Sequence, residues 1–92
     1  MTIVVRFHPM NMTIAQYEDA VRREQGTASF PPDGRDYHVC FGTDGDLRVS
    51  EIWDSQEQLQ GYGEVLMPIL ADAGIQFSGE PEIFEVHNIV RR

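Results

Sequence analysis

Residues 36–53 read DYHVCFGTDGDLRVSEIW, and this stretch decides the fold. Residues 36–41 and 47–53 are rich in β-branched and aromatic side chains, which favours two strands. The GTDG segment at 42–45 between them is typical of a hairpin turn. Because the turn is tight, the two strands are expected to be antiparallel neighbours in one sheet.

On the N-terminal side of this hairpin, the sequence predicts a strand and a helix. Residues 2–8 (TIVVRFH) form the strand, which Pro9 ends. The helix has Thr13 as its N-cap, Gln16 as the capping-box partner and Gly26 as its stop. The apolar face of this helix consists of Ile14, Tyr17, Ala20 and Val21.

On the C-terminal side, a second helix follows the hairpin and a fourth strand comes last. Asp54 and Ser55 can each cap the helix, and Gly74 closes it. Residues 82–90 (EIFEVHNIV) form the last strand, just after Pro81. The apolar stripe of the second helix consists of Leu59, Tyr62, Leu66, Ile69, Leu70 and Ala73.

Three residues of this second helix are poor helix formers. Gly61 and Gly63 each cost about 0.5–1 kcal/mol relative to alanine in a helix interior. Pro68 removes a backbone hydrogen bond, so we expect it to kink or split the helix just before it. For the glycines we favour close packing of a bent helix against the sheet. The alternative is that the small residues leave room for a ligand or a partner.

The element order βαββαβ over residues 1–92 predicts a single α+β domain with the ferredoxin-like fold. This fold has a four-stranded antiparallel sheet with two helices on one face and nothing on the other. A sheet face in contact with water should be mainly polar, yet no predicted strand here has a purely polar side. We therefore expect a homodimer in which two sheets pack face to face.

Composition argues against several classes of partner. Fifteen acidic and seven basic residues give a net charge of −8, so we expect no binding to nucleic acid or to anionic membranes. No apolar run approaches the ~20 residues of a membrane span. Residues 1–8 do not resemble a signal peptide, and the lone Cys40 fits a reducing compartment. A cytoplasmic location is the expectation.

The hairpin register decides which side chains of its two strands share a face. A two-residue loop at 44–45 suits a type I′ turn and places His38 opposite Glu51. A three-residue loop would instead place Tyr37 opposite Glu51. We prefer the first register, in which His38, Glu51 and Trp53 share one face because side chains alternate along a strand.

His38 and Glu51 are the candidate catalytic residues. An imidazole titrates near neutral pH, and a carboxylate beside it would orient it. The pair suits removal of a proton beside a carbonyl or from a phenol, which an isomerase, a cyclase or a cofactor-independent oxygenase needs. The alternative is an ordinary cross-strand polar contact.

Arg6 and His8, on the mixed side of the first strand, could bind a substrate carboxylate or enolate. The candidate substrate-binding residues are Trp53, Arg6, His8 and Tyr62.

Neither a metal nor an organic cofactor is predicted. The three histidines and Glu51 could meet across the sheet, but none of them shows ligand spacing within one element. The hairpin glycines Gly42 and Gly45 do not lie in a strand-to-helix turn, so they do not form a phosphate-binding loop.

The strand-to-helix junction EIWDS at 51–55 and the Gly-Ile pair at 74–75 resemble the dimeric α/β-barrel superfamily. The nearest resemblance is to small proteins of the antibiotic-biosynthesis-monooxygenase type, and the order of elements agrees over the whole chain. The resemblance implies a homodimer with a cavity between sheet and helices in each subunit. Members include cofactor-independent oxygenases of aromatic polyketides, haem-degrading enzymes, isomerases and proteins with no known activity.

The resemblance is partial at the level of single residues. In the oxygenase branch a tryptophan at the end of the third strand lines the cavity, and Trp53 matches it. That branch also uses an asparagine on the first strand, whereas Asn11 lies beyond Pro9 and outside the strand. The haem-degrading branch has an axial histidine in the second helix. Residues 55–74 contain no histidine, so haem degradation by that mechanism is not expected.

Two functions remain as hypotheses. The first is a cofactor-independent monooxygenase or an acid–base isomerase or cyclase, which acts on an apolar or aromatic substrate in a pocket that contains His38, Glu51 and Trp53. The second is a non-catalytic ligand-binding or accessory homodimer, whose pocket is small or filled by Trp53 and Tyr62. A void below roughly 300 Å³, the low end for ligand sites, would favour the second.

Overall fold

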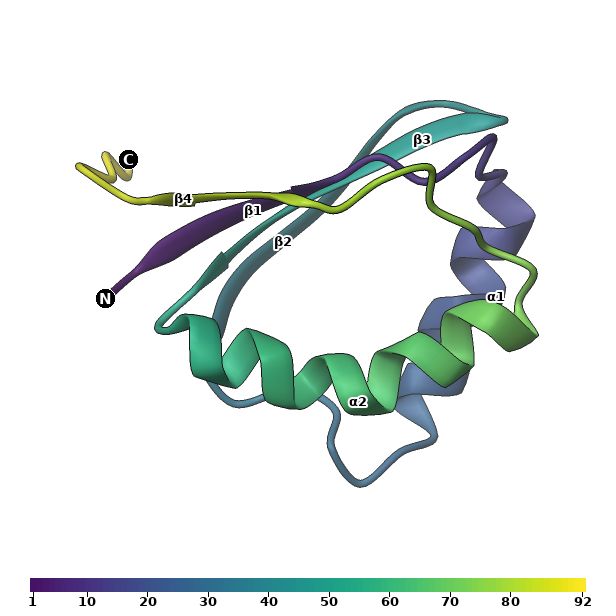
Figure 1. The fold of residues 1–92 in the computed structure, drawn as a ribbon, viewed down its shortest axis with the longest axis horizontal. Helices are drawn as coiled ribbons and strands as arrows, with labels where there is room; N and C mark the ends of the chain where they lie inside the picture. Colours follow the sequence, from purple (N-terminus) through teal and green to yellow (C-terminus); the bar gives the residue numbers. More distant parts are fainter.

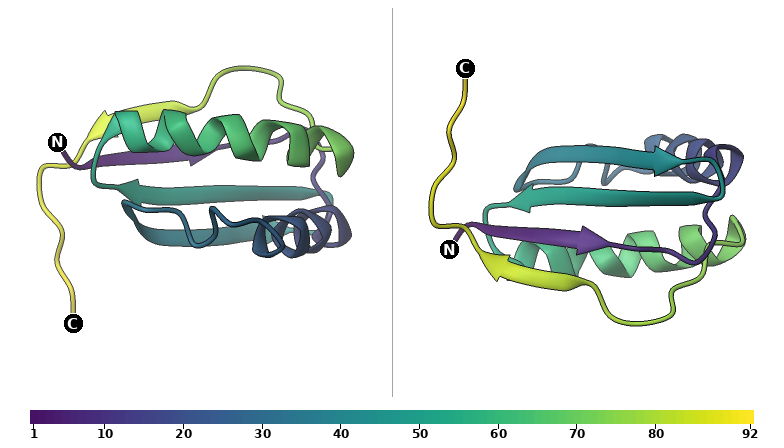
Figure 2. Two further views of the ribbon diagram at one scale, coloured as in Figure 1. Left: turned by 90° about the horizontal axis from the view of Figure 1, so that it is seen from below. Right: turned by 90° about the horizontal axis from the view of Figure 1, so that it is seen from above.

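The computed structural model describes residues 1–92, and its elements follow the order βαββαβ (Figure 1). The sheet has the strand order β2-β3-β1-β4, and every neighbouring pair is antiparallel. Both helices cover the same face of the sheet and leave the other face open (Figures 1 and 2). The ferredoxin-like prediction is therefore confirmed. The elements are β1 (Ile3–Phe7), α1 (Ile14–Gln25), β2 (Arg35–Thr43), β3 (Asp46–Trp53), α2 (Gln56–Asp72) and β4 (Glu82–Glu85).

The helix ends follow from their capping residues. Thr13 accepts a hydrogen bond from the backbone N–H of Gln16, and the Gln16 side chain accepts one from the N–H of Thr13. The predicted capping box is thus present, and Gly26 caps the other end of α1. Ser55 caps α2 by accepting the backbone N–H of Gln58.

The second helix is continuous through its proline. α2 runs unbroken from Gln56 to Asp72 with Pro68 inside it, so Pro68 does not split the helix, and the kink stays a prediction. Its apolar stripe packs along two separate parts of the core, through Leu59 and Leu66 on one side and Ile69 and Leu70 on the other. Packing of an amphipathic face commonly outweighs a local defect in helix propensity. No helix of the structure is both long and apolar enough to cross a membrane.

The core between sheet and helices is divided into two apolar clusters. Trp53 and Val5 are fully buried in one of them, and the other gathers around Met12. A divided core leaves space between its parts, and the candidate site occupies that space. The first cluster consists of Ile3, Val5, Trp53 and Tyr62, and the second of Met12, Ala20, Leu47, Val49 and Ile75.

The β2–β3 hairpin has the predicted register, with His38 opposite Glu51. Its turn is not of type I′, because that type needs a positive φ at both central residues. Here φ is +88° at Gly45 but is not positive at Asp44. The carboxylate of Asp44 accepts the backbone N–H of Ile14, which ties the turn to the start of α1.

A β-bulge at Asp36 interrupts the alternation of β2. Arg35 lies opposite Trp53, and the next residue of β2 with a partner is Tyr37. The extra residue shifts the alternation of side chains by one position for the residues that precede it. Arg35 therefore points to the face that carries the helices. Without the bulge, alternation from His38 would place Asp36 on this face instead.

The fourth strand is shorter than predicted. β4 ends at Glu85, whereas the sequence pattern predicts a strand over 82–90, so the last part of that prediction is wrong. The reason is the length of β1, the strand with which β4 pairs. Glu85 lies opposite Ile3, the first residue of β1. Beyond Glu85, β1 offers no further residues with which residues 86–92 could pair as a strand. This C-terminal tail therefore leaves the sheet (Figure 2).

Candidate functional site

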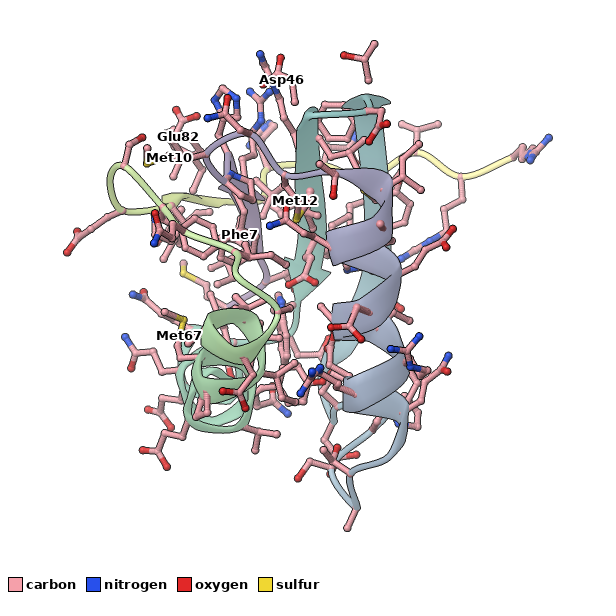
Figure 3. The ribbon with its side chains drawn as sticks, turned by 90° about the vertical axis from the view of Figure 1, so that its right-hand side faces the viewer. Phe7, Met10, Met12, Asp46, Met67 and Glu82 are labelled. Atoms are coloured by element: carbon pink, nitrogen blue, oxygen red, sulfur yellow. The ribbon has the colours of Figure 1, made fainter.

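A cavity of about 390 Å³ lies between the sheet and the helices. Its wall is mainly apolar, and Phe7 of β1 and Met67 of α2 contribute from the two layers (Figure 3). The volume exceeds the ~300 Å³ at the low end for ligand sites, so the cavity is not filled by its own side chains. Gln60, Glu80 and Pro81 also line it and are exposed, which places the opening between α2 and the segment before β4.

Glu51 lies in the wall of this cavity with three hydrogen-bond donors around it. His38 Nδ1 donates to Glu51 Oε2 across 2.5 Å, and the Arg35 guanidinium donates to the same oxygen across 3.1 Å. Trp53 Nε1 donates to Oε1 across 2.9 Å. Only 3% of Glu51 is exposed, so these donors take the place of water around the carboxylate.

The same contacts keep Glu51 ionised. Burial alone would raise the pKa of Glu51, but the hydrogen bonds from His38 and Trp53 and the charge of Arg35 outweigh it. The pKa of Glu51 therefore lies below the usual range of a glutamate. At neutral pH the carboxylate is negative and can stabilise a positive charge on His38.

We expect this carboxylate to make stability depend on pH in acid. The pKa of Glu51 is lower in the folded than in the unfolded protein, where it is about 4.3. Its contribution is therefore complete well above that value and is lost as the pH falls through the folded-state pKa. Urea unfolding from neutral pH to about pH 3 should show a larger loss of stability for the wild type than for Glu51→Gln. Equal losses in the two proteins would contradict this prediction.

Tyr17 extends the network from α1, and the sequence prediction placed it only in the apolar face of that helix. Its hydroxyl lies 2.7 Å from His38 Nε2, and the two rings stack with centroids 5.9 Å apart and an interplanar angle of 14°. Since His38 Nδ1 donates to Glu51, the neutral imidazole accepts the Tyr17 O–H at Nε2. Mainly burial raises the pKa of Tyr17 to about 12, so the phenol keeps its proton. A hydrogen-bonded chain thus joins the cavity to a buried carboxylate.

The structure brings four of the predicted site residues to one cavity: His38, Glu51, Trp53 and Tyr62. Trp53 is fully buried in the wall and packs on Tyr62, with ring centroids 5.9 Å apart. These two aromatic side chains were the ones expected to fill a non-functional pocket. They stand beside the open volume instead.

Arg6 and His8 lie on the opposite face of the sheet. They alternate with Val5 and Phe7, whose side chains point toward the helices, and they border a separate depression of about 70 Å³. His8 Nε2 lies 3.0 Å from a carboxylate oxygen of Asp46, at the end of the hairpin and away from Phe7 (Figure 3). The histidines therefore do not converge. No group of three or more His, Cys, Asp or Glu side chains is placed to hold a metal ion.

A second polar pair, which the sequence analysis missed, also lines the cavity. Glu24 near the end of α1 is only 7% exposed and accepts the O–H of Tyr62 across 2.5 Å. Burial, followed by the hydrogen bond to Glu24, raises the pKa of Tyr62, so Tyr62 remains a donor. One signal was available in the sequence: Glu24 follows Tyr17 by seven residues, which places both on one helix face.

Comparison with solved structures gives matches over the full length of the chain. SnoaB, a cofactor-independent oxygenase from Streptomyces nogalater, aligns with a TM-score of 0.62 and 17% identity, over 99% of this chain and 96% of that one. The chain has the SnoaB fold. A candidate antibiotic biosynthesis monooxygenase from Chloroflexus aurantiacus gives a TM-score of 0.60 and 18% identity, over 99% and 98% of the two chains. No protein-family model and no curated protein matches the sequence.

A protein of the same description from Deinococcus radiodurans gives a TM-score of 0.58 and 13% identity, over 100% of this chain and 98% of that one. Identities this low establish a shared fold and leave function to be argued from the site. In the present chain that argument starts from the cavity and the Tyr17–His38–Glu51 hydrogen bonds.

The glycines of α2 are not explained by close packing. A β-carbon added at Gly61 or at Gly63 would meet no atom within 4 Å, so the favoured interpretation is wrong. The two positions differ in one respect: Gly63 lines the cavity and Gly61 does not. Gly63 thus adds open volume to the cavity, whereas Gly61 faces away from it.

Alanine at either glycine is expected to raise the free energy of unfolding by roughly 0.5–1 kcal/mol, because glycine is a poor helix former. Leucine should separate the two positions. Naphthylmethanol, a small aromatic alcohol, is a suitable probe ligand because the cavity is apolar and about 390 Å³ in volume. Gly63→Leu should fill part of the cavity and weaken the binding of this probe in a calorimetric titration, whereas Gly61→Leu should leave that affinity unchanged. A similar loss of affinity in both variants would argue against the cavity as the binding site.

Proposed function

We propose that this protein is an enzyme that removes a proton from an apolar or aromatic substrate, as a cofactor-independent monooxygenase or an acid–base isomerase. The observation that carries the proposal is the hydrogen-bonded chain Tyr17–His38–Glu51 in the wall of a 390 Å³ apolar cavity. A base next to a fixed carboxylate in a mainly apolar site is suited to proton abstraction. The fold shared with the oxygenase SnoaB favours the oxygenase within this pair.

In the proposed reaction, a phenol or enol O–H of the substrate donates its proton to the Tyr17 oxygen. Tyr17 passes its own proton to His38 Nε2, the atom to which its hydroxyl already donates. The products of this step are a substrate anion and an imidazolium ion, so charge is conserved. The imidazolium forms next to the ionised Glu51, and the anion is left beside the Tyr17 O–H, which can donate to it.

The substrate anion then has two fates. Reprotonation at another carbon completes an isomerisation. Reaction of the electron-rich anion with dioxygen, which enters as a second substrate, begins an oxygenation. Arg35 and Trp53 contact Glu51 and not the substrate anion in this scheme, so they are positioning residues that keep the carboxylate fixed and charged.

Turnover of a hydroxylated anthrone in air tests the proposal. Conversion of its CH₂ group to a carbonyl consumes one O₂ and releases one H₂O, and the anthraquinone product is followed by its absorbance. The wild type should accelerate the reaction over buffer, and His38→Gln should do so far more weakly. If the wild type accelerates neither this reaction nor the isomerisation of a β,γ-unsaturated ketone, the enzyme proposal fails.

We further propose that the chain forms a homodimer through the open face of the sheet. Large apolar side chains lie exposed on its outer strands: Tyr37 is 49%, Phe41 38% and Phe84 54% exposed. Between them, Val4 and Ile52 lie opposite each other on β1 and β3. Tyr37, Ile52, Val4 and Phe84 thus form an apolar row across all four strands of the open face, and a second copy of the same face would cover it.

Sedimentation equilibrium at micromolar concentration should give twice the mass of the chain. Ile52→Lys should dissociate the dimer, because it places a charge within the apolar row of the open face. Met67→Lys is the matched control, since Met67 is 54% exposed but lies on α2. A monomeric wild type, or dissociation by both substitutions alike, would overturn this interface.

A further inference from the structure

The proton-transfer chain leaves one buried carboxylate of the cavity unused. Glu24 is only 7% exposed, and the one hydrogen-bond partner of its carboxylate is the Tyr62 hydroxyl, which donates to Oε1. Its second oxygen, Oε2, accepts no hydrogen bond from the protein. Every side-chain polar atom without a partner keeps some accessible surface, so Oε2 is accessible, and Glu24 is one of the residues that line the cavity.

The charge of Glu24 is not balanced by the protein. Arg35 is the one arginine in the cavity wall, and the chain contains no ion pair to Glu24. Arg35 is already bonded to Glu51 across 3.1 Å. A carboxylate removed from water without a cation or several donors is costly. A ligand group that donates a hydrogen bond or carries a positive charge would lower that cost.

The free oxygen is held in a fixed direction. Tyr62 donates to the other oxygen of Glu24, and Tyr62 itself packs between Trp53 and the Arg35 guanidinium, whose carbon lies 5.8 Å from the Tyr62 ring centroid. Side chains held from two sides lose little freedom when a ligand binds. Glu24 and Tyr17 are seven residues apart on α1, a rise of about 10 Å, so the two polar ends of the cavity are separated.

We propose that Glu24 is a ligand-binding residue whose free oxygen accepts a hydrogen bond from a hydroxyl or ammonium group of the ligand. The cavity thereby selects apolar ligands that carry such a donor and rejects ligands that carry a carboxylate. A ligand that also reaches Tyr17 spans about 10 Å along α1. The inference rests on the proposed use of the cavity as the ligand site.

Three naphthalene compounds that differ in one substituent test this selectivity: naphthylmethylamine, naphthylmethanol and naphthoate. Isothermal titration calorimetry with the wild type should give a Kd for the amine and the alcohol at least about tenfold lower than for naphthoate, as expected for hydrogen bonds to a charged group. Equal Kd values for the amine and the alcohol would identify the hydrogen bond as the source of selectivity. A lower Kd for the amine would identify its charge as well.

Two variants separate Glu24 from the rest of the cavity. Glu24→Gln keeps the shape and removes the charge, and it should weaken amine binding about tenfold without weakening naphthoate binding. Tyr62→Phe keeps the carboxylate and removes its protein donor, so the preference for the amine should persist. Thermal unfolding establishes that each variant is folded. If Glu24→Gln does not fold, the Kd ranking of the three compounds in the wild type and in Tyr62→Phe still tests the role of Glu24.

The inference is overturned if the wild type binds naphthoate as tightly as the amine and the alcohol. It is also overturned if Glu24→Gln leaves the ranking unchanged, or if Tyr62→Phe abolishes the preference. Because the titrations measure binding without turnover, they can succeed where the anthrone assay fails. Failure of the titrations in turn leaves the assignment of His38 untouched.

Discussion

The His38→Gln variant is expected to turn over substrate about 10²–10⁴-fold more slowly than the wild type, the usual contribution of a positioned general base. In the wild type, His38 Nδ1 lies 2.5 Å from Glu51 Oε2. Glutamine is close in size to histidine, and its amide can still donate a hydrogen bond to Glu51. The amide cannot take up a proton at neutral pH, so the relay from Tyr17 has no acceptor. The kcat of the two proteins in the anthrone assay measures the effect.

Two further variants control for this result. His87→Gln changes a histidine that is exposed in the C-terminal tail, and it should leave kcat unchanged. Tyr17→Phe removes the hydroxyl that donates to His38 Nε2 and should lower kcat while the protein remains folded. A His38→Gln enzyme within a factor of about three of the wild type would show that His38 is an ordinary cross-strand contact.

Trp53→Ala is expected to lower the free energy of unfolding by about 3–5 kcal/mol, the usual cost of truncating a large buried aromatic side chain. Trp53 is fully buried, packs in one cluster with Ile3, Val5 and Tyr62, and donates its N–H to Glu51. The loss is large beside the 5–15 kcal/mol typical of a folded protein. Urea unfolding followed by circular dichroism is the measurement, because the substitution removes the only tryptophan.

Trp53→Phe separates packing from hydrogen bonding at this position. It keeps an aromatic ring and loses the N–H, so it should cost about 1–3 kcal/mol, the penalty for leaving a buried acceptor without its donor. A loss below about 1 kcal/mol for Trp53→Ala would show that the ring is not part of the core.

The predictions that hold depend on local chemistry. The hairpin signal, the capping box at Thr13 and the stop at Gly26 each involve residues within a few positions of one another. The register of the hairpin follows from its loop length, and it brings His38 opposite Glu51. Once that register is known, alternation places Trp53 on the same face. The fold and the central pair of the candidate site were therefore predictable from the sequence.

The features that were missed depend on contacts between distant segments. Tyr17 looks like a core residue on an apolar helix face, and only the packing of α1 over β2 places its hydroxyl at His38. Glu24 pairs with a residue 38 positions away. The early end of β4 depends on where its partner β1 begins. Arg35 was missed for another reason. Strict alternation along β2 places its side chain on the open face of the sheet, and only the bulge at Asp36 turns it toward the cavity.

The bulge at Asp36 has a consequence for how homologues of this chain can be compared. Because of the bulge, Arg35 and His38 are three positions apart and still share the face that carries the helices. Deletion of Asp36 would leave the two residues two positions apart, so strict alternation would keep the arginine on that face. A homologue that keeps all these residues but pairs β2 without a bulge would turn the arginine to the open face, and Glu51 would lose its guanidinium. Two such homologues, aligned without a gap, share an arginine that they use on opposite sides of the sheet.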